Sequence, residues 1–442
     1  MASTRLTKTF SSSGNRNKWT ISLWVKRGKL GSTQTLFACH QNSNYKTRLE
    51  IAADDELYFN DEYNGNTNGR IVSNAKLRDT NAWYHIVGIW DKDNSTSGDK
   101  IRFYINGSRI TSFSDTGNAP SNASTLNVDG QVHEFGSENS GNLFDGAMSH
   151  IHFCDGYAYE PTEFGETDST TGEWKIKTSP SVSYGTNGFF ILKDGNGVTD
   201  QSPNSNDWTV SAGTLTKTED CPSNLFCTLN PQGLEQWTLS NGNLSISGAS
   251  DNQMVVGTMH SDAGYYEVKM TGTSHGSGGK GARIGLCKVD GSHPITYTGI
   301  SGNSGDLEKF IGVQTANGNY KAIYNNGYEV TNYSSDSWSQ NDILQVAWKN
   351  NKIWYGVNGT WLGSGNPSAG TNEADTLTSG SMYAPAIISS LAGADGSQFN
   401  FGNGYFGTTA ISSEGTNASG IGKFEYDVPT GCTAVSTKGL NE

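Results

Sequence analysis

Clustered carboxylates are the first residues of this chain whose types and spacing suit catalysis. Glu50, Asp54 and Glu56 lie at even intervals, which places them on one face if the segment is a strand. Retaining glycosidases need two carboxyl groups about 5 Å apart in such an arrangement. However, the acidic run 54–56 directly precedes the apolar residues 57–59, and that order is typical of a turn leading into a strand. We therefore interpret the cluster as an exposed hairpin turn, with hydrolysis as the weaker alternative.

Oxygen-bearing side chains also recur along residues 91–99. Asp91, Asp93, Ser95 and Asp99 have a spacing with which a loop can wrap around calcium, although the final Glu and the central Gly of an EF-hand are missing. A solvated polar hairpin explains the same residues. The pattern therefore leaves open whether this loop binds calcium.

Two imidazoles form the other grouping with metal-binding potential. His150 and His152 share one face of an expected strand, a spacing that allows metal binding where copies of a chain meet on a symmetry axis. An alternating strand with its polar face turned to solvent is the other interpretation. The remaining histidines, including His85 and His260, are expected to be partly buried without a special role. The prediction is that the protein has no cofactor, and metal binding by the histidine pair stays open.

Six widely spaced cysteines form no CxxC pair, so a structural zinc site is not expected. Cys221 and Cys227 are close enough to bridge a loop. The N-terminal residues contain no apolar secretion segment, so we expect reduced cysteines and no cleaved signal.

Charge and hydropathy exclude several classes of partner. The 442 residues include 30 Lys and Arg against 43 Asp and Glu, which gives a net charge of −13. Such a chain is a poor ligand for a nucleic-acid backbone or an anionic membrane surface. The longest apolar stretch, 384–394, is interrupted by Pro385, Ser389 and Ser390, so no membrane insertion is expected.

The elements that position these residues are expected to be strands throughout. Residues 83–90 carry large side chains at alternating positions on both faces, as a covered strand of a sandwich does. Residues 101–105 alternate again and end at Asn106-Gly107, the strongest short signal for a hairpin. The same order, an apolar strand followed by Asn-Gly, recurs over 353–359. The predicted fold class is all-β, with two antiparallel β-sandwiches.

Composition changes along the chain suggest where the domains begin and end. Between the two sandwiches lies a turn-rich stretch with many aromatic residues, which we expect to be an ordered connector packed on one or both of them. The C-terminal tail is rich in Gly and Ser and has a candidate edge strand at 424–431. The predicted boundaries are 1–160 for the first sandwich, 161–236 for the connector, 237–406 for the second sandwich and 407–442 for the tail.

Aromatic side chains near turns are the favoured ligand-binding candidates. Sugars stack their C–H faces on Trp and Tyr, while Asn bonds their hydroxyls. Core or interface packing is the alternative for each of them. The candidates are Tyr63 with Asn64 and Asn66 in the first sandwich, and Tyr328, Tyr333, Trp338 and Trp361 in the second.

Specific motifs in each sandwich resemble known domain families. Residues 20–26 (TISLWVK), 83–91 (WYHIVGIWD) and 103–107 (FYING) resemble the laminin-G/pentraxin-like branch of the concanavalin A-like sandwiches, over about residues 3–161. Residues 264–269, 353–358 and several shorter motifs resemble a SPRY-type sandwich, over about residues 239–405. The first resemblance implies a lectin-like domain, and calcium sites occur in that branch.

The order of motifs along nearly the whole chain resembles tail-fibre or virion-appendage proteins of marine tailed bacteriophages. The motifs that carry this resemblance are SLWVKRG, FDGAMSHIHFCDGYAYEPTEFGE, SYGTNGFFILKD, NDWTV and CPSNLFCTLNP, together with the SPRY-like block. The chain begins directly in the lectin-like sandwich, without an attachment domain or shaft, which favours a compact appendage over a long fibre.

The sequence therefore predicts a non-enzymatic phage virion protein that presents a lectin-like surface for attachment to a host cell. Its expected partners are other virion proteins and a host-surface glycan or protein, and a homo-oligomer, with a trimer favoured, would add avidity. A capsid-decorating or tail-stabilising protein is the alternative. A polysaccharide depolymerase is a weaker alternative, because no clear pair of catalytic carboxylates is present.

Overall fold

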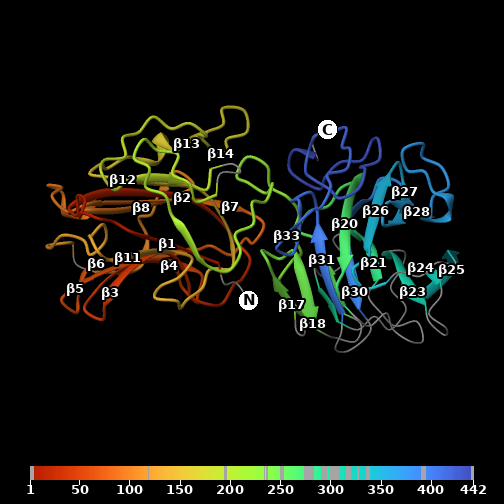
Figure 1. Cartoon of the computed structure of the whole chain (residues 1–442), viewed down its shortest axis with the longest axis horizontal. Helices are drawn as coiled ribbons and strands as arrows, with labels where there is room; N and C mark the ends of the chain where they lie inside the picture. The colour runs from red at the N-terminus through yellow and green to blue at the C-terminus, as the bar shows by residue number, and fades with distance from the viewer. Residues whose placement is uncertain are drawn as a thin grey trace. The chain divides into compact units, whose positions relative to one another are not determined.

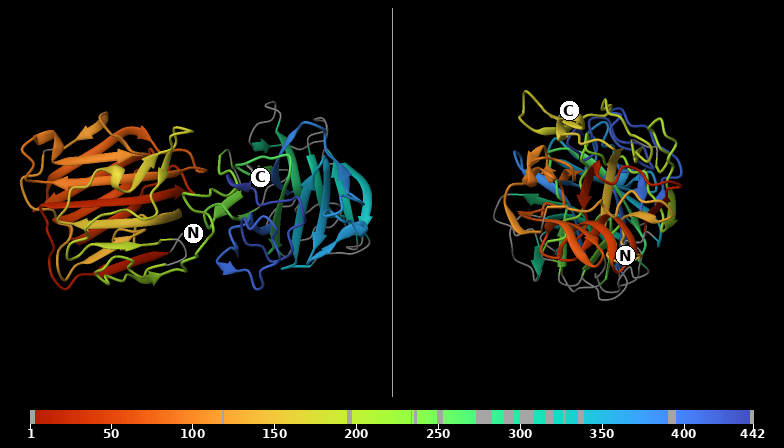
Figure 2. Two further views of the ribbon diagram at one scale, coloured as in Figure 1. Left: turned by 90° about the horizontal axis from the view of Figure 1, so that it is seen from above. Right: turned by 90° about the vertical axis from the view of Figure 1, so that its left-hand side faces the viewer.

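The computed structural model divides into two compact units, each built from β-strands (Figures 1 and 2). Unit 1 comprises Met1–Lys217 and Cys221–Ser223, and unit 2 comprises Thr218–Asp220 and Asn224–Glu442. The residues described are 4–117, 119–193, 197–232, 234, 237–248, 253–272, 283–289, 296–298, 308–314, 320–325, 328–334, 339–389 and 395–439. Within these ranges there is no α-helix, and the 3₁₀ turns include η1 (Ser97–Asp99), η2 (Pro161–Glu163) and η3 (Leu362–Ser364). No helix in these ranges has the length and apolarity needed to cross a membrane.

Unit 1 is a sandwich of two antiparallel sheets. The first sheet has the spatial order β10 (Phe113–Thr116), β6 (Asn66–Lys76), β5 (Glu56–Tyr63), β4 (Tyr45–Ile51), β3 (Gln34–Asn42), β11 (Val132–Phe135), β1 (Arg5–Thr9) and β16 (Thr209–Ala212). The second has the order β15 (Phe189–Ile191), β12 (Gly146–Asp155), β2 (Lys18–Arg27), β7 (Trp83–Asp91), β8 (Ile101–Ile105) and β9 (Ser108–Arg109).

The core of unit 1 follows from strict alternation along these strands. On β5, Leu57 and Phe59 face the core, whereas Tyr58, Asn60 and Glu62 lie on the opposite, outer face of the first sheet. Stacked large rings, such as Trp19 and Trp90 with their ring centroids 6.0 Å apart, fill the space between the sheets. The predicted covered strand is confirmed, because β7 is buried on both of its faces.

A third layer covers the outer face of the second sheet of unit 1. Residues 157–187, which include the hairpin β13 (Gly165–Thr167) and β14 (Trp174–Ile176), pack a small apolar cluster against β7, β8 and β12 (Figure 1). We call this segment the cover. It explains why Val87 and Cys154 are buried although they point away from the main core. The stretch 161–217, predicted as part of a connector, thus lies in unit 1.

Unit 2 is a second antiparallel sandwich. One sheet has the order β17 (Trp237–Ser240), β18 (Ser245–Gly248), β31 (Asp395–Asn400), β20 (Gly264–Met270), β26 (Ile343–Lys349), β27 (Lys352–Val357) and β28 (Thr360–Trp361), with β29 (Asp375–Thr376) also paired to β27. The other has the order β22 (Thr296–Thr298), β19 (Gln253–Val256), β30 (Met382–Ser389), β21 (Arg283–Val289), β23 (Glu308–Gln314), β24 (Tyr320–Asn325) and β25 (Tyr328–Ser334). A small hairpin of β32 (Tyr405–Phe406) and β33 (Thr409–Ala410) follows.

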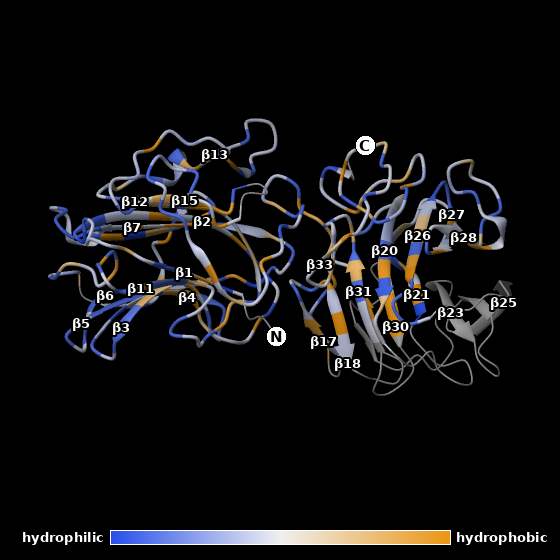
Figure 3. Ribbon diagram, viewed as in Figure 1, coloured by the Kyte–Doolittle hydropathy of each residue, from blue (hydrophilic) through white to orange (hydrophobic). Residues whose placement is uncertain are grey.

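Figure 3 shows apolar residues on strands such as β20 and β26 of unit 2.

The C-terminal residues 424–434 cover the outer face of the sheet that contains β20 and β26. There Phe424 and Val428 pack on Tyr265 and Ala347. The candidate edge strand at 424–431 does not form. Its backbone is instead held by side chains of the sheet, among them the carboxylate of Glu267.

The predicted Asn-Gly hairpins are both present. Asn106 and Gly107 join β8 to β9 with φ of 48° and 76°, and Asn358 and Gly359 join β27 to β28 with φ of 48° and 82°. Positive φ at both central residues is the geometry that favours Asn-Gly in such turns. Together with the two pairs of sheets, this confirms the all-β class with two antiparallel sandwiches.

Candidate functional site

Two neighbouring hairpins at one end of the first sheet of unit 1 carry the sequence-predicted residues of that unit. Tyr63 ends β5, Asn64 has a φ of 52° in the turn, and Asn66 begins β6. The next hairpin along the sheet, between β3 and β4, comes close enough for the N–H of Gly65 to donate to the carbonyl of Asn44 at 2.9 Å. The three predicted residues therefore lie together at the exposed tips of these hairpins. We call this surface the rim.

Tyr45, which the sequence reasoning missed, completes the aromatic part of the rim. Its ring lies 5.2 Å from that of Tyr63 in an edge-to-face arrangement with an interplanar angle of 84°. Both rings are half-buried, so each keeps part of its surface open. A signal for Tyr45 was present, because it closes an Asn-rich turn just as Tyr63 opens one.

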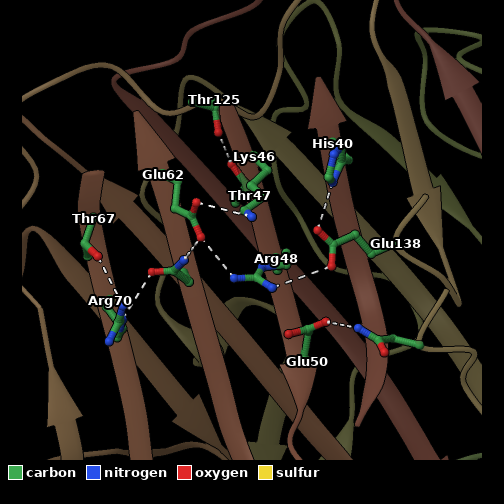
Figure 4. Close-up of polar contacts among 12 residues, drawn as sticks. His40, Lys46, Thr47, Arg48, Glu50, Glu62, Thr67, Arg70, Thr125 and Glu138 are labelled. Carbon is green, nitrogen blue, oxygen red and sulfur yellow. Dashed lines mark hydrogen bonds and ion pairs between the residues drawn. The ribbon is translucent and has the colours of Figure 1, made fainter. Parts of the chain in front are cut away.

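The outer face of the sheet carries a polar network that starts at the residues next to the rim tyrosines in the chain (Figure 4). Glu62 is its centre. Its Oε2 lies 3.3 Å from Lys46 Nζ, while its Oε1 lies 3.0 Å from Arg48 Nη2 and accepts a 2.8 Å hydrogen bond from Asn60 Nδ2. Strand register explains this grouping, because Lys46 pairs with Glu62 and Arg48 with Asn60 across β4 and β5.

Arg48 links this centre to residues from other parts of the chain. Its Nη1 lies 3.7 Å from Glu138 Oε2, and Glu138 Oε1 lies 3.0 Å from His40 Nδ1 (Figure 4). The Arg48 guanidinium also lies 5.8 Å from the ring centroid of Tyr58. Glu138 reaches this face from the loop after β11, which contains positive φ angles at Asn139, Ser140 and Asn142.

Arg70 extends the network toward the sheet edge. It donates to Asn60 Oδ1 at 3.3 Å and to Thr67 Oγ1 at 3.1 Å, and it forms an ion pair with Asp115 at 2.7 Å. The nearby carboxylate of Asp115 raises the pKa of Arg70 above its usual value. The side chains of Glu62, Arg48 and Arg70 are 18%, 20% and 31% exposed, so they are held in place yet reachable from solvent.

The first sequence-predicted carboxylate cluster does not form a catalytic pair. Asp54 lies in an exposed turn as predicted, but Asp55 is buried between Arg27 and Arg78, and Glu56 pairs with Lys76. The predicted turn before β5 is present at residues 53–55, but the expected exposure is wrong for Glu50, Asp55 and Glu56, which are buried.

Glu50 lies instead on the outer face of β4, beside the polar network. Its Oε1 accepts hydrogen bonds from Thr35 Oγ1 at 2.8 Å and from Asn142 Nδ2 at 3.3 Å. Burial raises the pKa of Glu50 above its usual value. This carboxyl group belongs to the same sheet face as Arg48, and its contact with Asn142 joins residues 92 positions apart, which no local pattern predicts.

In the 91–99 loop the carboxylates are separated rather than gathered. Asp91 lies 3.3 Å from Lys18, Asp93 lies 2.8 Å from Lys92, and Asp99 lies 2.6 Å from Arg109. Among the described residues no group of three or more His, Cys, Asp or Glu is arranged to hold a metal ion.

The histidine pair is buried, which contradicts the interpretation that these side chains face solvent. A bulge between Ser149 and His152, with a φ of 46° at His150, interrupts the pairing of β12 with β2. His152 Nδ1 lies 2.9 Å from the hydroxyl of Tyr184, and its ring stacks on Phe190 with centroids 3.9 Å apart. The six cysteines are free thiols.

The candidates in unit 2 do not come together in the same way. Trp361 on β28 is half-buried against the cluster that includes Tyr265, with ring centroids 6.5 Å apart. Tyr328 and Tyr333 lie on β25, whose side chains are outside the described part, and Trp338 lies outside the described residues. The rim and the polar network of unit 1 are therefore the candidate site.

Comparison with known proteins supports a lectin-like fold for this unit. A family profile described as "Concanavalin A-like lectin/glucanases superfamily" matches residues 4–163. No curated protein matches the chain.

Similar solved structures share little sequence with this chain. The heptameric SAP-like pentraxin of Limulus polyphemus is 16% identical and aligns over 34% of this chain and 69% of its own, with a TM-score of 0.26. Domains LG4-5 of the mouse laminin alpha1 chain are 11% identical over 96% and 92% of the two chains, with a TM-score of 0.29. The SPRY domain of human HERC1 is 15% identical over 39% of this chain and 96% of its own, with a TM-score of 0.28.

The site is built to offer hydrogen bonds rather than a free charge. The cations Lys46, Arg48 and Arg70 each lie within 3.3 Å of a carboxylate. Such a pre-ordered set of donors and acceptors, on a sheet that also carries two aromatic rings at the same end, suits the hydroxyl groups and C–H faces of a sugar.

Proposed function

We propose that this chain is a bacteriophage virion protein that attaches the particle to a glycan of the host surface through the rim and polar network of unit 1. The observation that carries the proposal is that two aromatic rings and the polar network lie at the same end of the first sheet. Tyr45 and Tyr63 contact each other at the tips of two hairpins. Their chain neighbours Lys46 and Glu62, whose side chains alternate to the outer face, form the ion pair at that end of the network. The lectin-family match over residues 4–163 supports a sugar as the ligand.

The phage context rests on the resemblance of motifs along the chain to virion-appendage proteins. A homo-oligomer, with a trimer favoured, would convert weak sugar contacts into tight attachment, because linked sites bind with high effective concentration. The role is attachment rather than cleavage, since the carboxylates of the site are paired with Lys, Arg and His side chains.

Immunogold labelling of intact virions tests the location, and adsorption assays test the role. We expect label on the tail, and we expect the purified chain to bind host cells and to slow phage adsorption. Label spread over the capsid would favour the alternative role in capsid decoration. Absence of label, or a purified chain that neither binds host cells nor slows adsorption, would overturn the proposal.

A further inference from the structure

A fully buried histidine lies where the cover of unit 1 meets the second sheet. His85 on β7 stacks on Trp24 of β2, with ring centroids 4.6 Å apart and an interplanar angle of 12°. From the other side Trp174 of β14 contacts the same imidazole, at 5.9 Å and 18°. The cover therefore meets the sheet through an imidazole placed beside two indole rings.

The hydrogen bonds of His85 define its protonation state. Trp174 Nε1 donates to His85 Nδ1 at 2.9 Å, while His85 Nε2 lies 2.8 Å from the hydroxyl of Ser22. An indole N–H can only donate, so Nδ1 must be an unprotonated acceptor. His85 is thus neutral, with its proton on Nε2 and directed at Ser22.

We propose that His85 and Trp174 form an acid-sensitive latch: a proton from solvent that binds Nδ1 turns two donors toward each other, breaks the contact and releases the cover (157–187) while the core of unit 1 stays folded. No side chain can rotate to repair this contact, because neither the indole nor the imidazolium offers an acceptor.

The surroundings of His85 disfavour a positive charge. Its contacts on β2 and β14, namely Ser22, Trp24 and Trp174, are uncharged, and burial lowers the pKa of His85 from 6.5 to about 3. His152, the other imidazole beneath the cover, bonds Tyr184.

Burial, followed by the charges of His150, His85 and Lys193, also lowers the pKa of His152. Among the described groups that act on the two imidazoles, none is a carboxylate that would stabilise the charge.

The direction of the pH effect follows from linkage. Because the pKa of His85 is lower in the closed state, the contribution of this group to closure is complete above pH 6.5 and is lost as the pH falls toward about 3. Across this window the equilibrium for opening rises about tenfold per pH unit for each proton taken up.

Two buried cysteines distinguish release of the cover from unfolding of the unit. Cys154 is fully buried beneath the cover, in the cluster with Val87 and Phe164. Cys39 is fully buried in the main core between the two sheets. Release of the cover alone exposes Cys154, whereas unfolding of unit 1 exposes both thiols.

The test is pulse labelling of the full chain with a dithiodipyridine, which reacts with thiols in acid, followed by peptide mass spectrometry. As the pH falls below 6.5, we expect the labelling rate of Cys154 to rise at least tenfold per pH unit while Cys39 stays protected. Simultaneous labelling of both thiols, or protection of Cys154 until Cys39 reacts, would overturn the proposal.

Variants test the residues of the latch. His85→Asn keeps an acceptor for Trp174 but does not titrate. The slope of the logarithm of the Cys154 labelling rate against pH should therefore fall by about one, which corresponds to one proton fewer taken up on opening. Trp174→Phe removes the donor and should move release to higher pH. His260→Asn, at an exposed histidine of unit 2, is the matched control and should leave the profile unchanged. An unchanged slope in His85→Asn, with Cys39 still protected, would contradict the proposed mechanism.

Discussion

The buried carboxylate of Glu267 accepts the backbone N–H of Tyr426 at 2.8 Å, and this contact fixes the C-terminal segment on the outer face of unit 2. The N–H of Glu425 donates to the other carboxylate oxygen at 2.9 Å. Tyr265 and Asn400 supply two more hydrogen bonds, at 2.9 and 3.2 Å. The fully buried side chain of Glu267 thus joins β20 to the C-terminal segment around Tyr426, about 160 residues later in the chain.

The stability of unit 2 should fall as the pH rises from about 4.5 to about 7. Burial raises the pKa of Glu267 from 4.5 to about 7, although the four hydrogen bonds act in the opposite direction. In this window the folded state binds the proton and the unfolded state does not, so the contribution of this group to stability is lost on deprotonation. The loss is at most about 1.4 kcal/mol per pH unit.

Urea titrations with labelling of the core thiol Cys227 measure this effect. Glu267→Gln should remove the slope between pH 4.5 and 7, and Glu414→Gln, at an exposed carboxylate, should keep it. A slope that survives in Glu267→Gln would show that another group causes the pH dependence.

Local signals explain how much of this fold the sequence could predict. Asn106-Gly107 and Asn358-Gly359 need φ angles that few residues adopt, so their turns depend on two adjacent residues alone. Alternating patterns such as that of β7 likewise specify a strand and its buried faces. These predictions succeeded because their causes lie within a few residues.

Contacts between distant segments could not be predicted from the sequence. The bulge at His150 arises from pairing with β2 and has no local signature. Glu138 reaches Arg48 from a loop 90 positions further along the chain. His85 was expected to be partly buried but is fully buried, because a cover formed nearly 90 residues later encloses it. His260, for which the same burial was expected, is exposed.

The rim tyrosines should carry a measurable part of glycan binding. Tyr63→Ala removes one of two rings in edge-to-face contact and should weaken binding of the full chain to host glycan about tenfold, the equivalent of about 1.4 kcal/mol. Tyr157→Ala, at a tyrosine that is 39% exposed on the cover, is the control and should bind as the unmodified chain does. Equal losses in both variants would place the binding surface elsewhere.

Close packing between β7 and β8 should make any side chain at position 88 destabilising. A Cβ at Gly88 of β7 would lie 2.4 Å from the ring of Phe103, so Gly88→Ala should destabilise unit 1 by about 1–3 kcal/mol through overpacking. Gly98 in η1 has open space around the same position, and Gly98→Ala should change the free energy of unfolding by less than about 1 kcal/mol. The measurement is a urea titration with labelling of Cys39, and similar midpoints for both variants would contradict the packing argument.

Asp61 should be the most sensitive residue beneath the rim. Its buried carboxylate accepts hydrogen bonds from Thr47 Oγ1 at 2.6 Å, Thr125 N at 2.8 Å and Asn68 Nδ2 at 2.8 Å. It thereby joins β4, β6 and the 121–125 loop just below Tyr63. Asp61→Ala leaves these donors without their acceptor, which should cost about 3 kcal/mol of the stability of unit 1 and weaken glycan binding as well.

Asp115→Ala is the matched control, because its side chain is 50% exposed and pairs with Arg70 at the edge of the same sheet. Exposed ion pairs contribute at most about 1 kcal/mol, so its unfolding midpoint should stay near that of the unmodified chain. Both variants are compared by urea titration with labelling of Cys39 and by binding to host cells. If Asp61→Ala unfolds at the same urea concentration as Asp115→Ala, the carboxylate is not what holds these segments together.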